Sequence, residues 1–259
     1  MSTIFAAVLW GVGLFAATGA WAGPAVDRIK KAGKILVAVD ASYPPMEFEG
    51  PQGQPTGFDV DLARELAQKL GVKAEFVVMS WDGILAGLTS KRYDVIMSSM
   101  NITADRQKQV EFVEYLRLSQ LFVAAPGTTL DQEKALQGKT IAVQADTTSS
   151  DYVEGLKKKG IALKEVKAFK TAIDCFAALK SKHVDGIVID EPVGRYYQKQ
   201  DPKSFQITGK AMAPEPIGIA LRKEDLDLKK ALEEALVQVK KEGAFKTISE
   251  TWFGTDLGI

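Results

Sequence analysis

The chain has 259 residues, with 33 basic and 33 acidic side chains and therefore no formal net charge. No run of five like charges occurs, which disfavours a nucleic-acid partner and a polybasic membrane surface. Cys175 is the single cysteine, so an intramolecular disulfide is excluded. Its amphipathic helix pattern predicts a buried position.

The first 22 residues contain no charged side chain. The run IFAAVLWGVGLFAATGAWA ends in the small-x-small pattern that signal peptidase cleaves. We therefore predict a signal peptide over residues 1–22, a mature chain that starts at Gly23, and a periplasmic location. The usual basic residue near the start is missing, and about 20 apolar residues can also span a bilayer. Cleavage and retention as a membrane anchor both remain open.

The mature sequence alternates short apolar strands with helices of period near 3.6. The first set begins with a strand and a Gly/Pro-rich loop. Its predicted elements are strand 34–40, loop 43–57, helix 57–71, strand 74–79, helix 81–92, strand 93–99 and strand 118–126. A second set repeats the alternation: strand 139–144, helix 149–160, strand 162–166, helix 172–182 and strand 184–190. The end of the chain predicts an extended segment and two helices: 215–223, 226–243 and 245–253.

Strands that alternate with helices predict an α/β fold with parallel sheets covered on both faces. Two such sets predict two lobes, and the extended segments near 118–125 and 209–219 predict the crossings between them. The second lobe is then an insertion in the first. The expected boundaries are 23–121 and 213–259 for lobe 1, and 122–212 for lobe 2. Ligands of such folds bind beyond the carboxyl ends of the strands, where SSMNIT, DASYPP, QADTTSS and IDEPV are expected to converge.

The segment SSMNITADR (98–106) predicts a short helix capped by Thr103. Arg106 would lie in its first turn, where a cation opposes the helix dipole. A bound carboxylate would explain this arginine, because the guanidinium and the donors of the preceding residues could hold it together. An ion pair of Arg106 with Glu111 or Asp105 explains it equally well, and this segment alone leaves both interpretations open.

Four consecutive hydroxyl residues, Thr147 to Ser150, open a predicted helix of the second lobe. Helix capping needs one of them, so we expect a second anchor for the same anion. Asp190 ends an apolar strand, where a carboxylate needs a cation or donors, and an ammonium group is the natural partner. Asp40 ends a strand of the first lobe in the same way. Tyr43 and Trp81, in strand-end loops, offer aromatic faces to a cationic or amide side chain.

The sequence contains few of the residues and motifs that are typical of enzyme active sites. The single histidine, His183, precedes a strand at the end opposite the crevice, and we expect it to be exposed. No Cys/His spacing suits a metal, and no Gly-rich loop suits a phosphate or dinucleotide. We therefore expect no catalytic residue, no metal and no cofactor. Carboxylate chemistry by Asp190, Glu191 and Asp40 is the remaining enzymatic interpretation.

Five motifs carry a family resemblance over nearly the whole mature chain: YPPMEF…GFDVDLARELAQKLG, SWDGILAGLTSKRYDVIMSSMNITADR, GKTIAVQADTTSSDYV, DGIVIDEPV and GIALRK…L…AL. In order and spacing they resemble the periplasmic amino-acid-binding proteins of bacterial ABC importers, the extracellular solute-binding proteins of family 3. The resemblance implies a type II periplasmic-binding-protein fold, in which two lobes joined by two hinge strands close on one free amino acid. It also implies docking on the membrane subunits of an ABC permease, and we expect a monomer.

The resemblance implies that the α-carboxylate meets Arg106 and Thr148 and that the α-amine meets Asp190. It further implies that two aromatic rings sandwich the side chain and that Asp40 faces its far end. The full set of expected ligand-binding residues is Asp40, Tyr43, Trp81, Ser98, Ser99, Asn101, Arg106, Thr147, Thr148 and Asp190.

Three residues depart from the family pattern. Asn101 stands where Thr or Ser is usual, as a longer donor. Asp146 replaces the usual Gly before the hydroxyl run, which changes the expected geometry of the N–H groups there. Met46 replaces the common Phe, as a softer wall that would widen the pocket.

The sequence thus predicts binding of a polar or basic L-amino acid for import, without chemistry. The acidic residues Asp40 and Asp190 favour a cationic or amide side chain. One alternative is an exported enzyme that resembles the periplasmic cyclohexadienyl or arogenate dehydratases, which share this fold. Another is a sensor that presents the same lobes to a membrane receptor.

Overall fold

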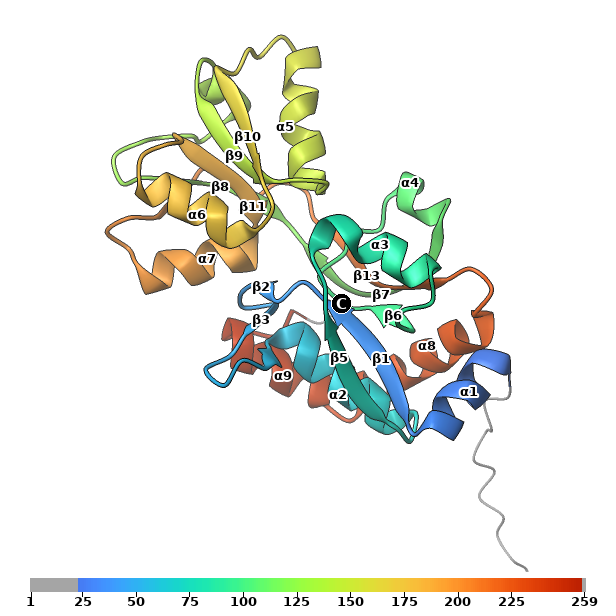
Figure 1. The fold of residues 1–259 in the computed structure, drawn as a ribbon. Coiled ribbons are helices and arrows are strands. Elements are labelled where there is room, and N and C mark those ends of the chain that lie inside the picture. The colour runs from blue at the N-terminus through green and yellow to red at the C-terminus, as the bar shows by residue number, and fades with distance from the viewer. Residues whose placement is uncertain (1–22, 258–259) are drawn as a thin grey trace, which may run out of the picture.

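Two lobes, each built around a five-stranded sheet, make up the protein (Figure 1). The computed structural model describes residues 23–257, so the predicted signal peptide, residues 1–22, lies outside the described residues. Within residues 23–257, no helix combines the length and the apolar character needed to cross a membrane.

The first lobe contains the sheet β5-β1-β6-β13-β7. Its strands are β1 (Lys34–Val39), β5 (Lys73–Val78), β6 (Val95–Ile96), β7 (Val110–Leu118) and β13 (Glu215–Arg222). Its helices are α1 (Pro24–Ala32), α2 (Phe58–Lys69), α3 (Trp81–Thr89), α4 (Ala104–Gln107), α8 (Leu226–Lys241) and α9 (Ala244–Phe253). A small sheet completes the lobe with β2 (Ser42–Tyr43), β3 (Glu47–Glu49) and β4 (Pro55–Thr56).

The second lobe contains the sheet β10-β9-β11-β8-β12. Its strands are β8 (Gln120–Ala124), β9 (Thr140–Gln144), β10 (Glu165–Phe169), β11 (Gly186–Asp190) and β12 (Gln206–Thr208). Its helices are the 3-10 helix η1 (Glu133–Leu136), α5 (Thr148–Lys158), α6 (Ala172–Lys180) and α7 (Glu191–Gln200). Cys175 is fully buried in α6 and His183 is exposed, as predicted.

The expectation of parallel sheets is wrong in part, because both sheets are mixed. β13 runs antiparallel to β6 and β7, and β8 runs antiparallel to β11 and β12. The reason lies in the crossings: β7 leads the chain out of the first lobe and β13 leads it back, so these neighbours run in opposite directions.

The chain crosses between the sheets at Ser119, between β7 and β8, and returns between β12 and β13. The expected end of the first lobe, residue 121, therefore falls inside β8. The segment 118–126 is predicted as one strand, but the polar residues Ser119 and Gln120 interrupt it at the crossing. β7 itself is not apparent in the sequence, because Glu111, Glu114 and Arg117 recur every three residues, a spacing that mimics a helix.

Apolar side chains cover both faces of each sheet. In the first lobe Leu66 of α2 and Leu232 of α8 surround a small gap on one face together with strand residues. Leu88 of α3 packs in a separate cluster with Ile96 on the other face. Because each buried Leu or Ile contributes about 1.5–3 kcal/mol, these cores can offset the cost of polar groups buried in the cleft.

The start of α2 is held by backbone rather than by a side-chain cap. The free N–H groups of Phe58 and Asp59 donate to the carbonyls of Pro45 and Met46, at 3.0 and 2.9 Å. Gly57 permits this approach: its φ is 127°, and a Cβ there would lie 2.3 Å from the Met46 oxygen. This turn places Asp59 beside the segment that carries the pocket residues Tyr43 and Glu47.

Candidate functional site

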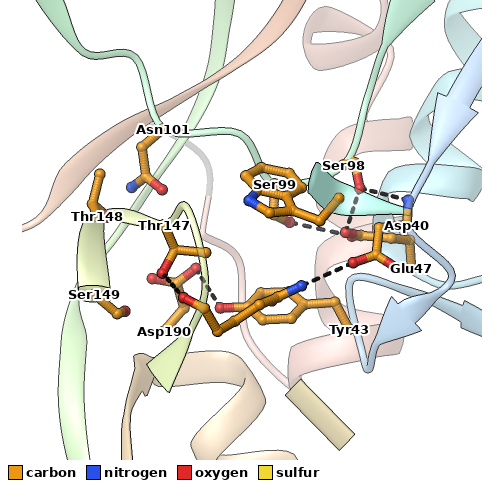
Figure 2. A pocket seen from close by; sticks show the side chains of 12 residues that line it. Asp40, Tyr43, Glu47, Ser98, Ser99, Asn101, Thr147, Thr148, Ser149 and Asp190 are labelled. Atoms are coloured by element: carbon orange, nitrogen blue, oxygen red, sulfur yellow. Dashed lines mark hydrogen bonds between the residues drawn. The ribbon is translucent and has the colours of Figure 1, made fainter. Parts of the chain in front are cut away.

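A pocket lies between the lobes (Figure 2). It is lined by Asp40, Tyr43, Glu47, Trp81, Ser98, Ser99, Asn101, Gln144, Thr147, Thr148, Ser149 and Asp190. Every residue of the expected set except Arg106 is among them. Arg106 lies next to the pocket, because its guanidinium contacts two lining residues, Asn101 and Trp81. Glu47, Gln144 and Ser149 also line the pocket and lie outside the set of ten expected ligand-binding residues, although Gln144 and Ser149 belong to the expected segment QADTTSS.

The carboxyl ends of parallel strands bring this set together. Asp40 follows β1 and Ser98 follows β6, which are neighbours in the first sheet. Gln144 ends β9 and Asp190 ends β11, which are neighbours in the second sheet. The predicted convergence of four strand-end loops is confirmed by these positions.

Arg106 lies in α4, and the Thr103 hydroxyl accepts from its backbone N–H at 3.2 Å, as predicted. The Arg106 guanidinium donates to the carbonyl of Asn101 at 3.0 Å and to that of Asp146 at 2.9 Å. Its central carbon lies 5.3 Å from the Trp81 ring centroid. Burial lowers the pKa of Arg106, although nearby acidic groups oppose this. The guanidinium is thus desolvated and held by neutral acceptors.

The ion-pair interpretation of Arg106 is wrong. Glu111 pairs with Lys229 and Asp105 pairs with Lys108. Among residues 23–257, no carboxylate lies within 4.0 Å of the Arg106 nitrogens. A desolvated cation without an anionic partner binds an incoming carboxylate strongly.

Only one hydroxyl of the Thr147–Ser150 run caps α5. Thr147 Oγ1 accepts from the Ser150 N–H at 3.2 Å and donates to the Gln144 carbonyl at 2.7 Å. Thr148 begins the helix and lines the pocket, where first-turn N–H groups attract anions. Hydroxyl groups that are not needed for capping therefore line the pocket, as expected.

Asp146 keeps the conformation that glycine usually provides. Its φ is 59°, in the left-handed region that aspartate tolerates better than most residues. This turn directs the Asp146 carbonyl across the cleft to Arg106 and to the Trp81 indole N–H, which lies 3.1 Å away. The substitution of glycine therefore leaves the turn before α5 intact.

Asp190 is a buried carboxylate, 4% exposed, at the end of β11. The Tyr43 hydroxyl donates to it at 2.9 Å from the opposite lobe (Figure 2). Burial raises the pKa of Asp190 to about 7, and the bond from Tyr43 and the charge of Arg106 only partly oppose this. An ammonium group in the pocket would offset the desolvation and favour the charged form.

The far end of the pocket joins the lobes through Asp40 and Gln144. Asp40 accepts from the Ser42 hydroxyl at 2.9 Å and from the Gln144 amide at 3.0 Å. The amide of Gln144 also donates to the Lys170 carbonyl at 3.1 Å. Burial raises the pKa of Asp40, so a donor-rich group would stabilise its charged form.

The expectation for Met46 is wrong. Its side chain is fully buried in the core of the first lobe and is absent from the pocket lining. The tight turn against Gly57 directs this residue away from the cleft. Tyr43 and Trp81 do line the pocket, and their role as a sandwich for a side chain stays a prediction.

Two further carboxyl groups support the pocket floor. The Ser98 hydroxyl donates to Glu47 at 2.8 Å (Figure 2), while the Ser99 N–H and the Tyr115 hydroxyl each donate to Asp59 at 2.7 Å. Burial raises the pKa of Glu47 well above its usual range and that of Asp59 to about 6, and the two carboxyl groups hydrogen-bond to each other. We infer that Glu47 is protonated and that its carboxyl O–H donates a hydrogen bond to the Asp59 carboxylate.

This arrangement holds Ser99 at a φ of 47°, a conformation that few residues other than glycine adopt. The sequence gives no local sign of the carboxyl pair, because Glu47 and Asp59 meet Ser98 and Ser99 across 40 or more residues. Among residues 23–257, no group of three or more His, Cys, Asp or Glu side chains is arranged to hold a metal ion.

Glu47→Gln is expected to retain the melting temperature and ligand affinity of the wild type, because a glutamine amide can donate to Asp59 as a protonated glutamate does. Glu47→Ala should lose about 2 kcal/mol or more of unfolding free energy, because it leaves buried partners unpaired. Thermal unfolding of both variants checks this. A glutamine variant as unstable as the alanine variant would show that Glu47 is ionised.

Comparison with known proteins places the chain among relatives of one kind. Residues 35–255 match the family model described as bacterial extracellular solute-binding proteins, family 3. The L-cystine-binding protein TcyJ of Escherichia coli is 30% identical over 235 residues, which cover 90% of this chain and 87% of that protein.

Two solved structures are also similar. A mutant of ArgBP from T. maritima has 37% identity and a TM-score of 0.82, and the match covers 89% of this chain and 100% of that one. The ancestral amino acid-binding protein AncCDT-1, described as a precursor of cyclohexadienyl dehydratase, has 34% identity and the same TM-score and coverage. Together with the two-lobed fold and the polar pocket between the lobes, the match over residues 35–255 shows that this chain belongs to family 3 of the bacterial extracellular solute-binding proteins.

Proposed function

We propose that this protein binds a free polar or basic L-amino acid in the cleft and delivers it to the membrane subunits of an ABC importer. The observation that carries the proposal is a half-buried guanidinium, Arg106, beside a pocket that holds a buried carboxylate, Asp190, where neither charge has an oppositely charged partner within 4.0 Å among residues 23–257. Arg106 and the first turn of α5 suit an α-carboxylate, and Asp190 suits an α-ammonium group. A zwitterion satisfies both at once.

The charge at the far end supports a cationic or amide side chain. Asp40 and the carbonyl oxygen side of Gln144 offer acceptors there, and Tyr43 and Trp81 line the path to them. Solved structures of ArgBP from T. maritima include an arginine-bound form, and curated relatives are named for cystine, arginine and histidine. We expect basic amino acids to bind this chain better than aliphatic or acidic ones.

Four hydrogen bonds already join the lobes across the cleft: Tyr43 to Asp190, Gln144 to Asp40, and Trp81 and Arg106 to the Asp146 carbonyl. These contacts form only when the lobes approach. A ligand that contacts both lobes would favour the same closed arrangement, because it binds that state more tightly than an open one.

A thermal-shift screen of the twenty amino acids tests the proposal. Arginine, lysine, histidine or glutamine at a hundredfold excess over Kd should stabilise the protein by about 2.7 kcal/mol through mass action. Leucine and glutamate should give little or no shift. A screen in which none of the twenty raises the melting temperature would contradict amino-acid binding.

The resemblance to AncCDT-1 makes an exported dehydratase the second candidate. Such an enzyme needs a proton donor at the leaving hydroxyl, and Asp190, whose pKa lies near 7, could serve as one. Turnover of prephenate or arogenate by the wild type, together with an absence of thermal shifts, would favour the enzyme over the binding protein.

A further inference from the structure

A chain of side-chain hydrogen bonds runs behind the pocket, from one hinge segment to the other. Gln120 begins β8 immediately after the first crossing, and Glu215 begins β13 immediately after the second. The Gln120 amide nitrogen lies 2.6 Å from Thr148 Oγ1 and 3.4 Å from Glu215 Oε2. Glu215 also accepts from the Asn101 amide at 2.8 Å.

The charge state of Glu215 fixes the direction of these bonds. A carboxylate can only accept, so the Gln120 atom that faces it must be the amide nitrogen. The same nitrogen faces Thr148, so the Thr148 oxygen must accept from Gln120. The hydroxyl hydrogen of Thr148 is then left to donate to a third group, and Thr148 lines the pocket.

We propose that Gln120 and Glu215 are positioning residues that hold the Thr148 hydroxyl as a donor toward the α-carboxylate of the bound amino acid. This inference rests on the proposed function. A carboxylate offers only acceptors, to Thr148 on one side and to Arg106 on the other. A neutral carboxamide must turn its NH₂ group toward one of these two donors. The relay therefore makes the site select a free carboxylate over an amide.

Burial supports the role of Gln120. Its side chain is 3% exposed, so a change of its hydrogen-bond partners cannot be compensated by bulk water. Asn101 joins the relay from the first lobe, with one of its two amide hydrogens on Glu215. The contact expected between Asn101 and the carboxylate can therefore involve only the other hydrogen.

The test compares the dissociation constants of L-arginine and L-argininamide by calorimetry. We expect the wild type to prefer L-arginine. Thr148→Val, which removes the hydroxyl, and Gln120→Met, which removes the amide at similar size, should each reduce the ratio of the two constants by roughly tenfold. The double variant should reduce it no further than Thr148→Val does. Glu215→Gln, which allows the Gln120 amide to turn, should give an intermediate ratio.

A matched control is Thr208→Val, on β12 next to β8, where the buried hydroxyl has no hydrogen-bond partner among residues 23–257. It should leave the ratio unchanged. Equal losses of affinity for both compounds in Gln120→Met would show a structural role and overturn the inference, while the proposed function would stand. A wild type that binds neither compound, and whose melting temperature none of the twenty amino acids raises, would contradict both.

Discussion

Arg106→Ala is expected to weaken the binding of free amino acids severely, with a loss of affinity of at least about thirtyfold. Removal of one partner from a buried charged pair costs about 2–5 kcal/mol, because the other charge is left unpaired. The α-carboxylate of a bound amino acid would be that other charge. Calorimetric titration with L-arginine measures the loss.

The fold should survive this change. The Arg106 guanidinium contacts two neutral carbonyls and the Trp81 ring and forms no ion pair among residues 23–257, so its removal should alter the melting temperature by only a few degrees. Arg64→Ala is the matched control, because Arg64 pairs with Asp61 at the surface, remote from the pocket lining. Unchanged affinity in Arg106→Ala would remove this residue from the site.

Asp190→Asn is expected to weaken binding severely as well, yet to stabilise the protein in the absence of an amino acid. The α-ammonium group loses its anionic partner, which again costs about 2–5 kcal/mol. An asparagine can still accept from the Tyr43 hydroxyl, but it carries no charge that burial disfavours. Calorimetry and thermal unfolding on the same sample separate the two effects.

The raised pKa of Asp190 determines how the stability of the protein without ligand changes with pH. Its pKa is about 7 in the folded protein against a usual value of 3.8. The folded state therefore binds the proton more tightly, and stability falls as pH rises from about 4 to 7, by up to a few kcal/mol. Asp190→Asn should remove this fall and show its largest gain in melting temperature near pH 8.

Ligand affinity should follow the opposite course. An ammonium group binds the ionised carboxylate, so wild-type affinity should be full above pH 7 and fall by up to tenfold per unit below it. A profile for the wild type that is flat between pH 5 and 8 would contradict the pairing of Asp190 with the ammonium group.

Much of the pocket could be predicted because strand ends converge. Asp40 and Asp190 each end a strong apolar run, and their meeting follows from parallel strands within each sheet. The cap at Thr103 and the position of Arg106 followed from a four-residue pattern. These features depend on local sequence and on one general property of α/β folds.

The residues behind the pocket could not be predicted in this way. Gln120 and Glu215 are 95 residues apart and meet only because both begin hinge strands. Glu47 lies in a Gly/Pro-rich stretch, where no period separates an inward from an outward side chain. Met46 shows the same limit, since the turn at Gly57 decides which of these neighbours faces the pocket.

A crystal structure of the protein with bound L-arginine tests the central claim most directly. We expect the Arg106 guanidinium from the first lobe and the Thr148 hydroxyl and N–H from the second to lie within hydrogen-bond distance of the same α-carboxylate. Asp190 should contact the α-amine. An amino acid held by one lobe alone, with Arg106 still bonded to the Asp146 carbonyl and remote from the carboxylate, would contradict the account.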